Sequence, residues 1–195
     1  MNMVYPLLKY IHLLGAALMS AGLIGVWLAE VRSRQVEALE LYTESVRWIA
    51  VFYDGLVLPG ALLALLSGVS LIALYYGGLG FLDHPWLIGM VGLFLFEFIE
   101  GNTLTRRYFT RLRRLSQEAV VSGWARRVLC DTRDRFTPTF AHFLDLPIIT
   151  VIIALGVIRP YTWEMMLSGT AAAIVIAAIL ALFIPRLYSW KTHHG

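Results

Sequence analysis

The sequence predicts an all-α, polytopic membrane protein: one transmembrane domain, residues 1–195, folded as a bundle of five membrane-spanning helices. Three observations lead to this fold class. Hydrophobic residues make up 58% of the chain and charged residues only 15%, against about 25% charged in soluble domains. Five apolar stretches reach the length of about 20 residues that a helix needs to cross a bilayer. The loops between these stretches alternate in positive charge, as in multi-pass membrane proteins.

The five predicted spans cover residues 5–29, 48–76, 85–105, 136–158 and 164–186. The first is too long for the apolar region of a signal peptide and has no basic segment before it. The second is long enough to tilt or to protrude. The third and fourth contain charged residues, whereas the fifth contains none between Met165 and Pro185.

The distribution of lysine and arginine predicts the orientation. One side carries only Lys9 and Arg159, and the other carries fourteen basic residues: Arg32, Arg34, Arg47, Arg106, Arg107, Arg111, Arg113, Arg114, Arg126, Arg127, Arg133, Arg135, Arg186 and Lys191. Because basic loops stay in the cytoplasm, we expect the N-terminus outside and the C-terminus inside. The predicted location is the inner (cytoplasmic) membrane of the cell.

The basic cytoplasmic segment 106–135 is the one sizeable element outside the membrane. We expect it to continue the third helix and then to fold back as an amphipathic helix. Apolar residues are interleaved among its arginines, among them Leu112, Leu115, Val120, Val121 and Trp124. The segment would either rest on anionic lipid headgroups or serve only to fix the orientation. Nucleic acid is not an expected partner, since these arginines lie against a membrane.

Spans two, three and four carry ionisable residues at membrane depth. At a rise of about 1.5 Å per residue, these side chains lie about 9–15 Å from the basic interface. Glu97 with Glu100, and His142 with Asp145, are three residues apart, so each pair shares a helix face. The sequence therefore predicts one layer in the inner half of the membrane: Asp54, Glu97, Glu100, His142 and Asp145.

Four carboxylates in one layer need a balancing positive charge, because each charge at membrane depth costs a few kcal/mol. The charge could come from a divalent metal ion, from protons, from a substrate cation or from arginines at the interface. In the purely structural alternative, a snorkelling arginine meets Glu100 or Asp54 and merely holds the bundle together. Inward-facing carboxylates with a histidine favour a metal site, but no Glu-x-x-His repeat is present.

His12 lies in the outer third of the first span, with Gly15, Ala16 and Met19 on its face. An imidazole beside small residues suits a haem ligand, since it can reach the iron while glycine admits the macrocycle. The imidazole could equally bond to a carbonyl of a neighbouring helix. His12 and His142 cannot hold one haem between them, because about 10 Å of membrane depth separates them.

Two segments carry a family resemblance: "LLKYIHLLGAALMSAGL" in the first span and "FAHFLDLPIITVIIALGVIRPY" in the fourth. The chain resembles a family of small bacterial five-helix integral membrane proteins without an assigned function. More distantly, it resembles the haem-containing, J-type protoporphyrinogen oxidases. That second resemblance implies a haem ligand at His12 and a fourth helix that ends in Arg159-Pro160. The oxidases also use a lysine near the start of their second helix, where this chain has only arginines.

The predicted function is that of a membrane redox protein, which binds haem b through His12 and handles protons or a metal at the inner layer. A haem-dependent oxidoreductase would be one form of this function. The first alternative is a cation or metal transporter, with the acidic layer as its cation site. The second is a non-catalytic subunit or assembly factor of a larger membrane complex. Expected partners are the lipid bilayer and, in the last case, other membrane subunits or a second copy.

Overall fold

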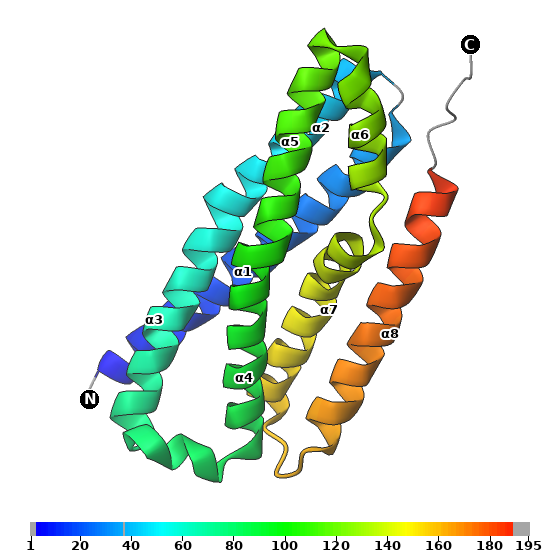
Figure 1. The fold of residues 1–195 in the computed structure, drawn as a ribbon. Coiled ribbons are helices and arrows are strands. Elements are labelled where there is room, and N and C mark those ends of the chain that lie inside the picture. The colour runs from blue at the N-terminus through cyan, green and yellow to red at the C-terminus, as the bar shows by residue number, and fades with distance from the viewer. Residues whose placement is uncertain (1–2, 37, 189–195) are drawn as a thin grey trace.

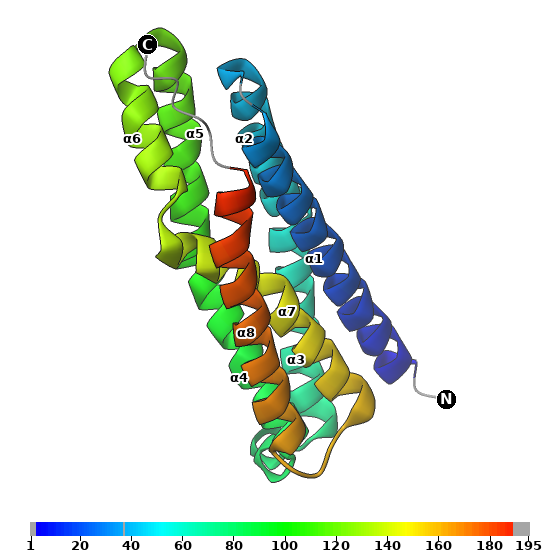
Figure 2. The same cartoon turned by 90° about the vertical axis from the view of Figure 1, so that its right-hand side faces the viewer.

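The computed structural model describes residues 3–36 and 38–188, and for residues 123–126 the backbone alone. These residues form helices and turns without a strand. Five helices are long and apolar enough to cross a membrane: Val4–Gln35, Leu39–Tyr75, Pro85–Val121, Phe136–Ile158 and Glu164–Leu187. They run side by side in an elongated bundle (Figures 1 and 2). For the described residues, the prediction of an all-α protein with five helices of membrane-spanning length is therefore confirmed.

Two of these long helices are divided by a turn of wider, π-helical geometry. The elements are α1 (Val4–Gln35), α2 (Leu39–Phe52), η1 (Tyr53–Val57), α3 (Leu58–Tyr75), η2 (Gly78–Asp83), α4 (Pro85–Glu100), η3 (Gly101–Thr105), α5 (Arg106–Val121), α6 (Gly123–Arg133), α7 (Phe136–Ile158) and α8 (Glu164–Leu187). The end of the bundle formed by α5, α6 and the start of α2 is called the basic end below (Figure 1). Lys191 and the side chains of Trp124 and Arg126 lie outside the described part.

The second long helix begins nine residues before its predicted start, at Leu39 rather than at residue 48. Tyr42, Val46 and Ile49 are buried and recur at helical spacing, while Glu40 and Glu44 lie on other faces. This segment is an amphipathic helix that packs against protein. Hydropathy does not reveal it, because its charged residues mask the apolar stripe.

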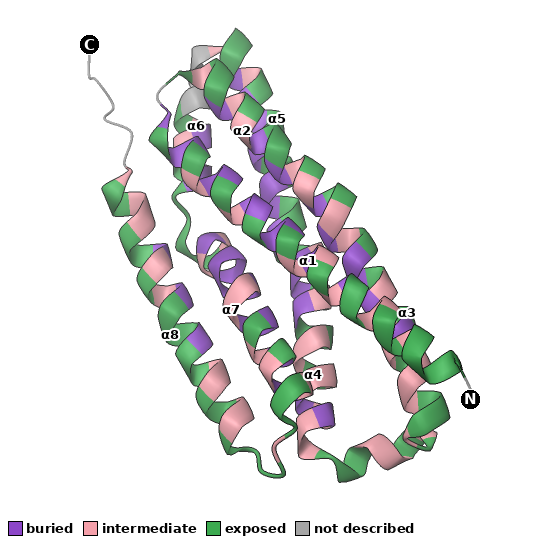
Figure 3. Ribbon diagram, turned by 180° about the vertical axis from the view of Figure 1, so that it is seen from behind, coloured by how far each residue is buried: buried purple, intermediate pink, exposed green. Residues whose placement is uncertain are grey.

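The third long helix continues without a break from the predicted span to Val121, and α6 then folds back against α5. The expected continuation of the third helix and its return are therefore present, while the location of the segment relative to the membrane stays a prediction. Its leucines, however, do not face a lipid surface: Leu112 and Leu115 are 0% and 4% exposed, within the hydrophobic core. Among the apolar residues named for this segment whose side chains are described, Val120 and Val121 remain exposed. Buried residues accordingly extend into the basic end, whereas α8 is mostly exposed or half-buried (Figure 3).

Glycines bring α1 and α3 into backbone contact. A Cβ atom on Gly15 would lie 2.6 Å from the nitrogen of Ala64, and one on Gly60 would lie 2.5 Å from the nitrogen of Met19. No side chain fits at such distances, so both positions require glycine. This crossing anchors the first half of α3. On its other side α1 contacts α7, and α4 packs against α7.

Both π-helical turns lie at the same level of the bundle. In the second long helix, the ring of Pro59 would press on the carbonyl of Gly55 in a regular α-helix, and the wider turn relieves this. In the third, the π-helical turn η3 begins at Gly101. Such turns change which residues share a face, because hydrogen bonds run from i to i+5. They set the directions of the side chains described next.

Candidate functional site

Four ionisable side chains from two helices meet in the middle of the bundle. Glu97 and Glu100 come from α4, and His142 and Asp145 from α7; their exposed fractions are only 5%, 7%, 0% and 3%. The carboxyl groups of Glu97 and Glu100 both interact directly with that of Asp145. These four residues are called the acidic cluster below. Their spacing of three residues on each helix positions them as the sequence predicts.

Several polar atoms of the acidic cluster have no hydrogen-bond partner: Glu100 Oε2, Asp145 Oδ1, and both ring nitrogens of His142. The closest approach between His142 and Asp145 joins Nδ1 and Oδ2 at 3.7 Å, which is beyond hydrogen-bonding distance. Leaving a buried polar group unpaired costs about 1–3 kcal/mol. Such a concentration of unpaired groups at one place in a hydrophobic bundle is characteristic of a site that takes up a proton, water or ion.

Asp54 does not join this cluster. Its side chain is 58% exposed, and its Oδ1 accepts a hydrogen bond from Arg106 Nη2 at 3.4 Å. The sequence predicted that Asp54 lies at the depth of the cluster and faces it, but the side chain points away from the cluster. The depth of a residue along a helix does not determine the direction in which its side chain points. This ion pair is the one expected under the structural alternative, in which an arginine at the interface meets Asp54. It leaves Arg106 engaged outside the acidic cluster.

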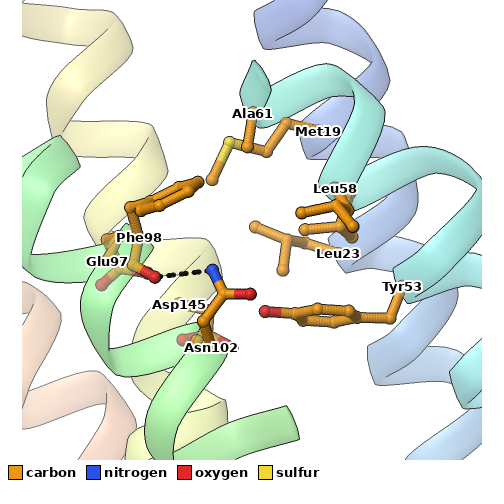
Figure 4. A pocket seen from close by; sticks show the side chains of 11 residues that line it. Met19, Leu23, Tyr53, Leu58, Ala61, Glu97, Phe98, Asn102 and Asp145 are labelled. Carbon is orange, nitrogen blue, oxygen red and sulfur yellow. Dashed lines mark hydrogen bonds between the residues drawn. The ribbon is translucent and has the colours of Figure 1, made fainter. Parts of the chain in front are cut away.

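A small cavity lies beside the acidic cluster (Figure 4). Met19, Leu23 and Leu58 form its apolar wall, while Glu97 and Asp145 contribute carboxyl groups. The volume open to the centres of water molecules is about 20 Å³, and one such molecule needs about 10–15 Å³. The cavity is therefore large enough for a water molecule in contact with the cluster.

The two π-helical turns shape this cavity. A Cβ atom on Gly101 would lie 2.8 Å from the hydroxyl oxygen of Tyr53, so glycine allows the phenol to approach η3. The hydroxyl points toward Asn102, whose amide donates to the carbonyl of Phe98 at 2.8 Å (Figure 4). Neither Tyr53 nor Asn102 was predicted from the sequence as part of the site. The signal available there was the pair Gly101-Asn102, which directly follows the buried glutamates.

The wide turn η3 also satisfies one oxygen of Glu100. Thr105 is buried, and its hydroxyl donates to Glu100 Oε1 at 2.9 Å. The two residues are five apart, and a regular α-helix would turn them well away from each other. The π-helical turn brings them onto one face. Only the second oxygen of Glu100 remains available for a proton or ligand.

A second buried ionic group, which sequence analysis missed, lies nearer the basic end. Glu30 and Arg34 are each 1% exposed and paired at 2.7 Å. The guanidinium group of Arg34 also forms an ion pair with Asp134 at 3.3 Å and donates to the carbonyl oxygen of Arg133 at 3.2 Å. The same carbonyl oxygen accepts a second hydrogen bond, from the hydroxyl of Tyr108 at 2.8 Å. These contacts join α1 to α5 and to the link between α6 and α7. The spacing of four between Glu30 and Arg34 was the signal, but Arg34 was assigned to orientation alone.

No described lysine or arginine forms an ion pair with Glu97, Glu100 or Asp145. Arg34 is engaged by Glu30 and Arg106 by Asp54. Among the residues that the structure describes, no three His, Cys, Asp or Glu side chains are arranged to hold a metal ion. The geometry thus gives no support to a metal centre at the predicted five residues, and metal binding there stays a prediction.

His12 lies far along α1 from the acidic cluster, toward the N-terminus. Its Nδ1 is 3.0 Å from the carbonyl oxygen of Ala64 and 3.2 Å from the hydroxyl of Ser67. A carbonyl only accepts, so Nδ1 carries the proton and Nε2 carries the lone pair. The space expected beside Gly15 is filled by α3. A Cβ atom on Gly68 would come within 3.1 Å of His12 Cε1, so glycine leaves room for the imidazole there.

The five apolar helices and the buried acidic cluster define a multi-pass membrane protein with an ionisable site in its interior. The chain belongs to the family described as predicted integral membrane protein (DUF2269), whose family profile matches residues 6–160. The match runs from residue 6, within α1, past the end of α7 and ends before α8, so it includes every residue of the acidic cluster. No curated protein matches the chain, and no solved structure does.

Proposed function

We propose that this membrane protein takes up and releases protons at the acidic cluster. The observation that carries the proposal is the contact of three buried carboxyl groups that no described arginine or lysine neutralises. Two carboxylates in direct contact cannot both be ionised without a proton or cation between them. The adjoining cavity supplies room for the water through which a proton can move.

In this proposal the basic end faces the cytoplasm, and the protein lies in the inner membrane with its N-terminus outside. The support is the segregation of arginines, since basic loops favour the cytoplasmic side. The acidic cluster then lies in the inner half of the membrane, and the buried Glu30–Arg34 pair lies between it and the cytoplasm. Glu30 is close enough to His142 to interact with it electrostatically. A proton arriving from the cytoplasm would therefore pass a charged, buried residue before it reaches the cluster.

Infrared spectroscopy of the purified protein in lipid tests this proposal. We expect the stretching band of protonated carboxyl groups, and we expect it to change reversibly with pH in the absence of divalent ions. The band should decrease in Glu97→Gln, because that variant removes one of the three carboxyl groups. A band that changes only when a divalent cation is added would instead support a cation site. Complete ionisation at every pH would overturn the proposal.

A second candidate function joins a redox group to this proton site: haem b ligated by His12. The supporting observation is the hydrogen bond from Nδ1 to Ala64, because the same bond orients histidines that bind metals through the other nitrogen. His12 and Arg159-Pro160 also match features of the haem-containing J-type protoporphyrinogen oxidases. Bound haem would supply one-electron transfer. His12 would bind the group through Nε2, while Ala64 and Ser67 would hold the imidazole ring in place.

The haem candidate predicts a visible spectrum for protein purified in mild detergent from cells that make haem. We expect a Soret band, with sharpened bands after reduction by dithionite, and loss of both in His12→Ala. His84→Ala is the matched control, because His84 packs on Tyr76 and Trp86 outside the bundle interior. A featureless spectrum, or one that His12→Ala leaves intact, would contradict haem binding at His12. It would not affect the acidic cluster.

A further inference from the structure

A groove on the surface of the third long helix is lined mainly by cationic side chains. Its volume is about 440 Å³, and its walls are Asn102, Arg106, Arg107, Thr110, Arg111 and Arg114. None of the described residues that line it is acidic. The amide of Asn102 and the hydroxyl of Thr110 add neutral hydrogen-bonding groups. This composition fits an anion with several oxygen atoms, since arginine binds such groups through two parallel hydrogen bonds.

Two of the four arginines are available for a ligand. Arg106 pairs with Asp54 at 3.4 Å, and Arg114 pairs with Glu118 at 3.6 Å. Arg107 and Arg111 are exposed and form no ion pair with any residue that the structure describes. They stand four residues apart and therefore extend from the same face of α5. Together they present two guanidinium groups to one occupant.

The groove begins where the apolar part of the same helix ends. Phe96, Ile99 and Leu104 are 48%, 61% and 50% exposed, as expected for side chains that face lipid. Arg107 and Arg111 follow Leu104 by three and seven residues, so they continue the face on which Leu104 lies. An acyl chain against Leu104 and Ile99 would therefore have its headgroup beside these two arginines.

We propose that this groove binds the phosphate group of an anionic phospholipid in the adjacent leaflet. The guanidinium groups of Arg107 and Arg111 hold the phosphate oxygens, and the exposed apolar strip above them receives the acyl chain. Arginines near an anionic membrane surface gain attraction from its negative potential. A lipid in this position also contacts η3, whose Gly101 shapes the cavity beside the acidic cluster. The inference does not depend on the proposed proton function.

A titration of the detergent-solubilised full chain with phosphatidylglycerol tests the site. Binding is read from the rise in melting temperature and by native mass spectrometry. We expect bound phosphatidylglycerol, and an affinity about 30-fold weaker in the double variant Arg107→Gln/Arg111→Gln, because each substitution removes a charge-assisted hydrogen bond to the phosphate that contributes roughly fivefold or more. Both side chains are exposed and unpaired among described residues, so these changes leave the fold intact.

The matched control is Arg113→Gln/Arg127→Gln, which removes the same charge from two exposed arginines outside the groove. It should keep most of the wild-type affinity. Equal losses in the two double variants would show a diffuse charge effect and overturn the site. Phosphatidylcholine should give a much smaller shift. An equal shift from inorganic phosphate, without lipid, would show a free-anion site and overturn the assignment to a phospholipid.

Discussion

Replacing Asp145 by asparagine is expected to raise the free energy of unfolding by about 1–3 kcal/mol at neutral pH. The reason is that Asp145 Oδ1 has no partner, while its carboxyl group faces those of Glu97 and Glu100. An amide has the same shape, carries no charge and can donate to either neighbour. The measurement is thermal unfolding of the wild type and Asp145→Asn in the same detergent, followed by circular dichroism.

The sign of this change separates two roles for Asp145. If the carboxylate of Asp145 were instead paired with a tightly bound cation, Asp145→Asn would lower the free energy of unfolding by about 3–5 kcal/mol, as the loss of one partner of a buried ion pair does. A gain in stability means that the wild type carries an unfavourable group at this position. Asp83→Asn is the control, because Asp83 is exposed in η2; its effect should stay within about 0.5 kcal/mol.

A gain in stability would matter for function as well. Protein interiors pair nearly all buried polar groups, so exceptions gathered at one place indicate a requirement other than folding. In this bundle the described exceptions include three of the four residues of the acidic cluster. The same Asp145→Asn variant should lose part of the pH-dependent carboxyl band. Greater stability together with reduced proton uptake would be the expected exchange between stability and activity.

The fold could be predicted from the sequence because length and hydropathy determine where a helix crosses a membrane. The fourth span, 136–158, agrees with α7 residue for residue. Errors arose at the end of the first span and at the start of the second, where the helices extend past the apolar segment. Leu39–Arg47 and Arg106–Val121 are helical for a different reason, the burial of amphipathic faces against protein. Charged residues hide these faces from a hydropathy reading.

The site was predicted in part for an equally physical reason. Spacing along one helix shows which residues share a face, so Glu97 with Glu100 and His142 with Asp145 were correctly paired. It does not show which way that face turns, and Asp54 therefore fell on the wrong side. The π-helical turns add to this, since they rotate every later residue and bring Thr105 beneath Glu100. Glu30 was missed because it stands just past the predicted end of the first span.

Replacing Arg34 by alanine is expected to lower the free energy of unfolding by about 3–5 kcal/mol, the cost of leaving one partner of a buried ion pair alone. Glu30 is 1% exposed and has its 2.7 Å contact with Arg34 Nε. The carbonyl of Arg133 would also lose a donor. Thermal unfolding in detergent measures the change, with Arg32→Ala as the control because Arg32 is exposed on the same helix.

The double variant Glu30→Leu/Arg34→Met separates the ion pair from the rest of the network. Two apolar residues of similar size remove both charges at once, and such replacements are often neutral or stabilising. We therefore expect the double variant to recover most of the stability that Arg34→Ala loses. Failure to recover would assign the stability to the bonds between Arg34 and the link from α6 to α7. If Arg34→Ala proved no worse than Arg32→Ala, the buried network would contribute nothing to holding α5 and α6 on the bundle.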